Sequence, residues 1–154
     1  MLTGPTLQNM LPSVLTKFRE AEVAFTADIE AMFSRIRLRP QDARYHRFLW
    51  REDGSSEIKT LQMDRLAFGD RCSPFIAINT IRRAATDSGV GGEVADAVHN
   101  NLYMDDYLDS AKNVELAVER ATGVKETLAA GDFHFKTWLS NSPDFLMAMG
   151  VDPA

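Results

Sequence analysis

Hydrophobic residues along this chain recur at two spacings, and each spacing predicts one kind of element. Apolar side chains three or four positions apart indicate amphipathic helices. This spacing occurs in the second half of 6–20, after Ser73-Pro74, over 114–130 and, in shorter form, at 30–36 and 93–100.

Two boundaries of these helices carry specific expectations. Ser73 is expected to be the N-cap of its helix, with Pro74 in the first turn. The inward face of that helix, which should end at Ser88-Gly89, is predicted to carry Phe75, Ile78, Ile81 and Ala85. The segment Pro40-Gln41-Asp42 is expected to break the helical segment at 30–36.

Short apolar or alternating runs between turn residues predict strands and hairpins. One hairpin is expected about Asp53-Gly54 and its two serines, and a second has Met104 and Asp105 in its turn. The predicted strands are 23–28, 44–52, 57–63, 102–104, 107–109 and 133–139. Two hairpins and further strands that alternate with helices predict an α+β fold, in which helices pack on one face of an antiparallel sheet.

Composition adds limits to this pattern. The 154 residues are 45% hydrophobic and 25% charged, which suits one globular domain. No apolar run approaches the roughly 20 residues of a membrane span, and the first residues lack a secretory signal. The single cysteine, Cys72, allows no internal disulfide and fits an intracellular setting. A net charge of −5 does not indicate a basic nucleic-acid surface.

Adjacent carboxylates lie in the second hairpin, in the stretch NNLYMDDYLDS at 100–110. Tyr103 and Asp106 should face each other across a two-residue turn, with Asp105 at its apex. The strand at 23–28 ends in Asp28, so the three carboxylates converge if the two strands are neighbours. Such an oxygen-rich site suits two Mg²⁺ or Mn²⁺ ions about 4 Å apart, as in phosphoryl transfer. The alternative is a solvated turn, since aspartate is favoured there on local grounds.

Several segments resemble the palm motifs of reverse transcriptases, in the same order. LYMDDYLD resembles the catalytic hairpin, and VAFTADIEAMF, LAFGDRCSPFIA and AAGDFHFKTW resemble the first, second and fourth motifs. With WLSNSP, these pieces are similar to those of BEL/Pao long-terminal-repeat retrotransposons. The resemblance runs from about residue 4 to 146, with Asp28 and Asp105 separated by 77 positions. It implies a polymerase palm with a ferredoxin-like core.

The resemblance also implies roles at the carboxylates. Asp28 and Asp105 would hold the two metal ions with help from the backbone carbonyl of Ile29, and Asp106 would be a weaker ligand. Lys136 would act as general acid on the leaving pyrophosphate, although a lysine on a strand is more often simply solvated. His46, His99 and His134 have no cysteine partner at ligand spacing, so zinc is not expected.

Contacts to nucleotide, template or primer are implied for Phe33, Gly69, Ser73, Pro74, Tyr103 and Met104. Phe33 would be the aromatic gate against a ribose 2′-hydroxyl, or else a core residue. Gly69 would let the backbone approach a nucleotide or the template, and Met104 would touch the primer end. Helix initiation is a sufficient alternative role for Ser73-Pro74, and sheet packing for Tyr103.

The resemblance implies a division into partial fingers or a connecting helix (1–22), the palm (23–146) and a tail (147–154). The expected partners are an RNA template, a DNA primer, deoxynucleoside triphosphates, and the fingers, thumb and RNase H domains of a longer polyprotein. Without those domains the chain is expected to be inactive. Cytoplasmic retrotransposon particles, with access to the nucleus as an option, are the expected location.

Two alternatives to a polymerase part remain open. One is a truncated or host-adopted fragment that folds but does not polymerise, and that has no function or acts as a binding module. The other is a different palm-like enzyme, such as a nucleotide cyclase or an RNA-directed RNA polymerase.

Overall fold

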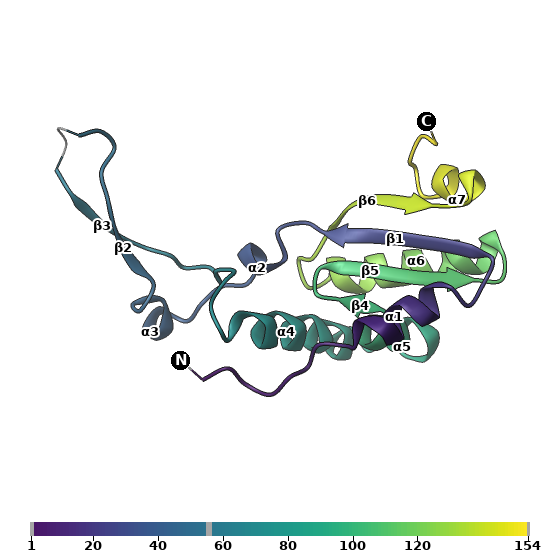
Figure 1. Ribbon diagram of the computed structural model, residues 1–154, viewed down its shortest axis with the longest axis horizontal. Coiled ribbons are helices and arrows are strands. Elements are labelled where there is room, and N and C mark those ends of the chain that lie inside the picture. Colours follow the sequence, from purple (N-terminus) through teal and green to yellow (C-terminus); the bar gives the residue numbers. More distant parts are fainter. Residues whose placement is uncertain (1, 55–56, 154) are drawn as a thin grey trace.

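A four-stranded antiparallel sheet forms the centre of the molecule (Figure 1). The computed structural model describes residues 2–54 and 57–153. The sheet order is β4-β5-β1-β6, and every neighbouring pair is antiparallel. Its strands are β1 (Val23–Ile29), β4 (Leu102–Tyr103), β5 (Asp106–Ala111) and β6 (Phe135–Ser140). Buried and partly exposed residues alternate along β1, as expected for a strand with one face on the core.

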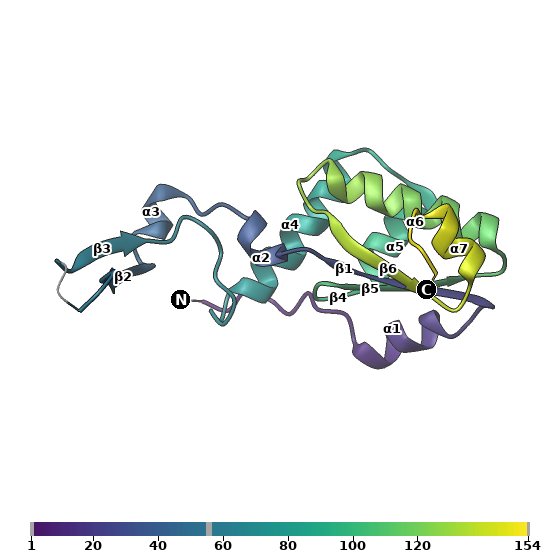
Figure 2. The same cartoon turned by 90° about the horizontal axis from the view of Figure 1, so that it is seen from above.

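Four helices cover one face of this sheet, which confirms the predicted fold class. Figure 2 shows these helices on one side of the sheet and α1 (Leu11–Phe18) on the other. The four are α4 (Ser73–Asp87), α5 (Gly92–Asn100), α6 (Val114–Ala129) and α7 (Pro143–Ala148). Among the described residues, no helix is long and apolar enough to cross a lipid bilayer.

The core between the sheet and these helices is rich in aromatic rings. Phe25 stacks on Phe145 with ring centroids 4.7 Å apart, and Tyr107 meets Trp138 edge-on at 6.1 Å. Phe145 is fully buried and comes from α7, a segment for which the hydrophobic pattern predicts no element. Ser142 caps this short helix by accepting a hydrogen bond from the Phe145 N–H.

The residues between β1 and α4 extend away from this body as an arm (Figure 1). The arm contains α2 (Met32–Arg35), α3 (Pro40–Ala43) and a separate hairpin of β2 (Arg47–Trp50) and β3 (Lys59–Gln62). The hairpin about Asp53-Gly54 is thus confirmed, while its two serines lie outside the described residues. The helix expected at 30–36 does end before Pro40, at Arg35. Pro40-Gln41-Asp42 is nevertheless itself helical, because proline fits the first turn of a helix and starts α3 there.

The start and the inward face of α4 differ from the predictions. Ser73 is not the N-cap, since Cys72 holds that position and Ser73, which is buried, is the first residue of the helix. Its hydroxyl donates a hydrogen bond to the carbonyl of Ala67. The buried face is Ser73, Ala77, Ile81 and Ala85. Phe75 and Ile78 are only partly buried, because they face the N-terminal segment, at Gly4 and Leu7.

Candidate functional site

The three carboxylates gather where β1 ends beside the β4–β5 hairpin. Asp28 is opposite Asp106 in the antiparallel register of β1 and β5. The next residue, Ile29, donates its N–H to the carbonyl oxygen of Asp105 at 2.8 Å. Tyr103 pairs with Asp106 across the turn, as the sequence predicts. Backbone pairing therefore holds the hairpin tip against the end of β1 and brings all three aspartates to one edge of the sheet.

The hairpin turn has an unusual backbone conformation at Met104. Its φ of +57° lies in the left-handed region, which disfavours residues other than glycine because Cβ approaches the carbonyl. Met104 also packs against the hydrophobic core. The turn is thus fixed by tertiary packing as well as by its own sequence, and it presents Asp105 beside β1.

The three carboxylates are close enough to affect one another's charge. The pKa of Asp106 is raised, first by partial burial and then by the negative charges of Asp105 and Asp28. Lys136, from β6 on the other side of β1, places its Nζ 3.3 Å from Oδ2 of Asp28. The lysine is therefore a counter-charge for one of the three aspartates.

The donor set at this edge fits magnesium or manganese in its chemistry. Carboxylate oxygens are the ligands these ions prefer. A cation would also favour the charged form of Asp106, whose pKa is raised first by burial and then by repulsion from Asp105 and Asp28. Within 2–54 and 57–153, no three His, Cys, Asp or Glu side chains are grouped closely enough to enclose an ion. Magnesium rarely uses such a cage, since it usually takes one or two carboxylates and completes its shell with water and substrate phosphates.

The other predicted contacts lie on the arm side of the sheet. Phe33 is on α2, is partly buried and packs against the core. This position fits the alternative interpretation of Phe33 as a core residue. Gly69 has a φ of +94° with open space around its α-carbon, so the turn before α4 needs glycine for its backbone. Pro74 lies in the first turn of α4, and α2 contacts α4. Asp70 pairs with His46, whose Nδ1 is 3.3 Å from Oδ2.

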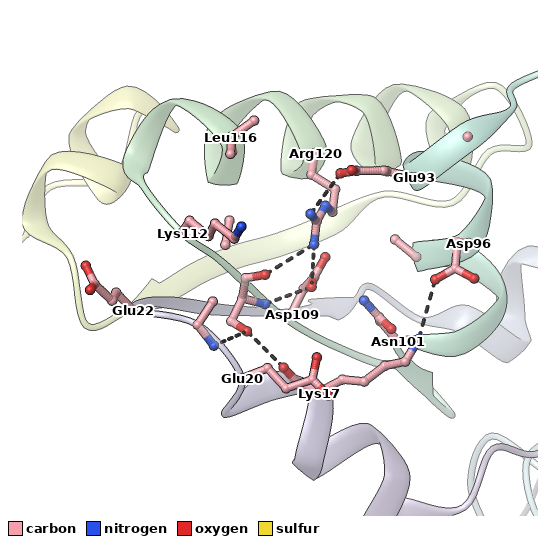
Figure 3. Close-up of a pocket in the computed structure, with 15 residues that line it drawn as sticks. Lys17, Glu20, Glu22, Glu93, Asp96, Asn101, Asp109, Lys112, Leu116 and Arg120 are labelled. Carbon is pink, nitrogen blue, oxygen red and sulfur yellow. Dashed lines mark hydrogen bonds and ion pairs between the residues drawn. The ribbon is translucent and has the colours of Figure 1, made fainter.

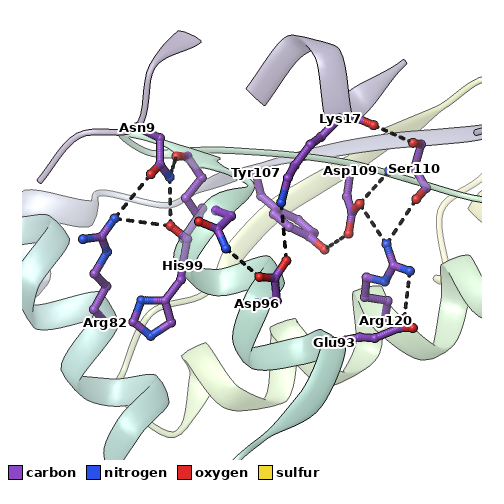
Figure 4. Close-up of polar contacts among 12 residues, drawn as sticks. Asn9, Lys17, Arg82, Glu93, Asp96, His99, Tyr107, Asp109, Ser110 and Arg120 are labelled. Carbon is purple, nitrogen blue, oxygen red and sulfur yellow. Dashed lines mark hydrogen bonds and ion pairs between the residues drawn. The ribbon is translucent and has the colours of Figure 1, made fainter. Parts of the chain in front are cut away.

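The N-terminal segment is fastened to the carboxylate hairpin by Asn9, which the sequence did not single out. The Asn9 amide donates to the carbonyl oxygens of His99 and Leu102 at 2.9 and 2.8 Å (Figure 4). Arg82 donates to the carbonyl of Leu7 at 3.0 Å. Arg82 therefore helps to hold the N-terminal segment against α4.

A buried charge network lies on the strand that leads away from the hairpin. Asp109 is 2% exposed and accepts a hydrogen bond from the Tyr107 hydroxyl at 2.7 Å. Arg120 on α6 reaches Asp109 at 3.1 Å and Glu93 on α5 at 2.9 Å (Figure 4). Burial, followed by the Asp109 charge, raises the pKa of Tyr107 well above its usual range. The network joins β5 to both helices.

A groove of about 1010 Å³ opens at this end of β5, away from the hairpin (Figure 3). Elements α1, α5, β5 and α6 line it with side chains of both charges. Asn101 lies in the groove between Lys17 and Asp109 (Figure 3) and is 5% exposed. In the described chain, its side-chain oxygen has no hydrogen-bond partner.

Comparison with known proteins shows which fold this chain resembles. Neither the protein-family models nor the curated proteins give a match. Among solved structures, the chain is similar to a foamy viral protease-reverse transcriptase in complex with an RNA/DNA hybrid, with a TM-score of 0.59 and 15% identity. The match covers 84% of this chain and 16% of the viral chain. The chain therefore has a reverse-transcriptase-like fold.

Proposed function

We propose that this chain is the palm part of an RNA-directed DNA polymerase. The observation that carries the proposal is the edge formed by Asp28, Asp105 and Asp106, where two antiparallel strands meet beside Lys136. A reverse-transcriptase-like fold around this edge supports the same reaction class. The substrates would be deoxynucleoside triphosphates and a DNA primer paired to an RNA template.

The reaction would join the primer 3′-oxygen to the α-phosphorus of the nucleotide as the bond to pyrophosphate breaks. Two bound magnesium ions would activate the hydroxyl and stabilise the leaving group. Asp28 and Asp105 would supply the ligand oxygens, with Asp106 and the Ile29 carbonyl in support. Lys136, which is paired with Asp28 in this structure, would turn to the pyrophosphate and donate a proton to it.

The finer assignment to BEL/Pao retrotransposons rests on four pieces that occur in the order of that family, namely DIEAMF, FLW, FGDRCSPF and KTWLSN. Because this chain matches 16% of the viral neighbour, the proposal includes partner domains that supply fingers, thumb and RNase H functions. The cytoplasmic particle of such an element would be its location.

Two measurements test the proposal. First, manganese binding to the 154-residue chain is followed by electron paramagnetic resonance for the wild type, Asp28→Asn and Asp105→Asn. Second, primer extension on an RNA template is measured in a longer polypeptide that includes the flanking coding sequence. Both site variants should lose metal binding and extension, whereas Asp144→Asn, an exposed carboxylate on α7, should lose neither. Full extension by Asp105→Asn would sink the mechanism.

One observation favours a second candidate, a binding module that keeps the fold without the reaction. The ion pair between Lys136 and Asp28 neutralises a proposed metal ligand with a protein side chain. For such a module, manganese binding would not depend on Asp28, and extension would be absent even in the longer polypeptide.

A further inference from the structure

The charges of this acidic chain are segregated between its arm and its body. The arm, which is the segment between β1 and α4 (residues 30–72), carries nine of the 17 Lys and Arg residues but only seven of the 22 Asp and Glu residues. Within 35–51 there are six arginines and a single carboxylate, Asp42. The arm is therefore basic although the whole chain has a net charge of −5. This contrast qualifies the expectation that the protein has no basic surface.

Some of these arginines have no carboxylate partner. Arg37 and Arg39 are exposed, and in the described parts of the chain neither forms an ion pair. Arg44 instead lies over the ring of Tyr45, with its guanidinium carbon 4.8 Å from the ring centroid. Arg35 differs, because it reaches Glu30 at 2.9 Å. Uncompensated positive charge thus remains where the chain leads into the hairpin.

Exposed aromatic rings lie in the same region. Tyr45 is 67% exposed, Phe48 43% and Trp50 50%. Phe48 and Trp50 are two residues apart on β2, so their side chains project from the same face of the hairpin. Their pairing partners on that face are Leu61 and Lys59. The body of the protein leaves this aromatic face uncovered, although it buries its other tryptophan, Trp138.

Phosphate and unstacked bases fit this combination better than a protein surface does. Two strand residues span about 6.8 Å, which is twice the rise of about 3.4 Å per stacked base, so one base can enter between Phe48 and Trp50. A symmetric contact between two copies of the chain would instead bring the arginines of 35–51 against the same arginines. Duplexes keep their base faces stacked inside, whereas single strands offer them to aromatic side chains.

We infer that the arm is a binding site for single-stranded nucleic acid, with bases stacked on Phe48 and Trp50 and phosphates held by Arg37 and Arg39. The inference goes beyond the proposed function, since binding at the arm needs neither a metal ion nor catalysis. The acidic residues at the hairpin tip, Glu52, Asp53 and Glu57, confine the phosphate contacts to the half of the hairpin nearer the body.

The first test uses the two tryptophans as reporters. A single-stranded oligouridylate of about 12 nucleotides, within the usual site size, is titrated into the 154-residue chain with EDTA present. Stacking should quench the emission of half-exposed Trp50 and leave that of buried Trp138 unchanged. In Trp50→Phe the quench should vanish, while anisotropy of the labelled RNA still reports binding. A quench that persists in Trp50→Phe would overturn the assignment.

The second test measures affinity and its dependence on salt. Trp50→Ala should weaken binding about 5- to 140-fold, equivalent to the loss of one base stack. Arg39→Gln should reduce the slope of log K against log salt by about 0.7, the value for one single-strand phosphate contact. Leu139→Ala on β6 and Arg19→Gln, exposed controls outside the arm, should match the wild type.

Two results would contradict the inference. One is equal affinity in Trp50→Ala and the wild type. The other is a dimer in sedimentation that Trp50→Ala dissociates, together with no RNA affinity, which would assign the aromatic face to a second copy of the chain. Because the titration contains EDTA, neither result bears on the proposed metal site. Conversely, Asp105→Asn should lose primer extension and still bind RNA at the arm.

Discussion

Removing the arginine of the buried network should destabilise the protein far more than removing an arginine from its surface. In Arg120→Met the methionine keeps much of the side-chain volume, but Asp109 loses its only cationic partner among the described residues. Asp109 is 2% exposed and would keep hydrogen bonds from Tyr107 and the Ser110 N–H. Breaking one side of a buried ion pair costs about 3–5 kcal/mol, because the remaining charge stays desolvated.

The geometry places the expected cost at the low end of this range. The Arg120 side chain is 22% exposed, and the adjacent groove admits water, so we expect about 3 kcal/mol. For a domain of this size, that loss lowers Tm by roughly 6–12 °C. The assay is urea unfolding with a fitted m value, which separates a change in stability from a change in the unfolded state.

A matched control is present on α4. Arg83 pairs with Asp87 at 2.7 Å, but both side chains are more than half exposed. Arg83→Met should therefore cost no more than about 0.5 kcal/mol, as expected for a surface pair one helical turn apart. Equal losses in Arg120→Met and Arg83→Met would refute the reasoning that burial controls the strength of these interactions.

Three further predictions concern the carboxylate edge and its supports. Asn9→Ala should cost about 1–3 kcal/mol in urea unfolding because two partly buried carbonyls lose their donor, whereas Asn79→Ala on the exposed side of α4 should be neutral. The folded-state pKa of Asp106 is raised, so the stability of the wild type falls as pH rises through that pKa. Without metal, Asp106→Asn should therefore have a higher melting temperature than the wild type at pH 7. The two melting temperatures should be equal below about pH 3.8, where the carboxyl is protonated in both the folded and the unfolded wild type. In Lys136→Met the lysine no longer competes with a metal ion for Asp28, so electron paramagnetic resonance should show tighter manganese binding while primer extension slows. Weaker manganese binding would show that Lys136 does not compete with the metal ion.

The fold itself was largely readable from the sequence because its signals are local. The turn at Met104-Asp105, the helix at 114–130 and the strand at 23–28 each follow from a few neighbouring residues and their period. The segment after Asn141 could not be read in this way. Six residues of α7 are too few to show a helical period, and this helix is held by the packing of Phe145 on Phe25.

The candidate site was predictable in its residues but not in its contacts. Asp28, Asp105 and Asp106 stood out as residue types at turns, and the structure brings them together through the pairing of β1 with β5. The pairing of Lys136 with Asp28 depends on β6 lying on the other side of β1, which no local pattern states. Asn9 escaped notice for the same reason, since its partners are 90 and 93 positions away.

The sequence alone determined most of the segments that form helices and strands, with α3 and α7 as exceptions, as well as where the acidic turn lies and which motifs resemble a polymerase palm. Only the tertiary structure decided the strand order, the face of α4 that is buried and the separation of a basic arm from an acidic body. The physical reason is the range of the interactions. Backbone sterics and hydrophobic period act over a few residues, whereas strand order and burial depend on residues far apart in the chain that pack together only in the folded state.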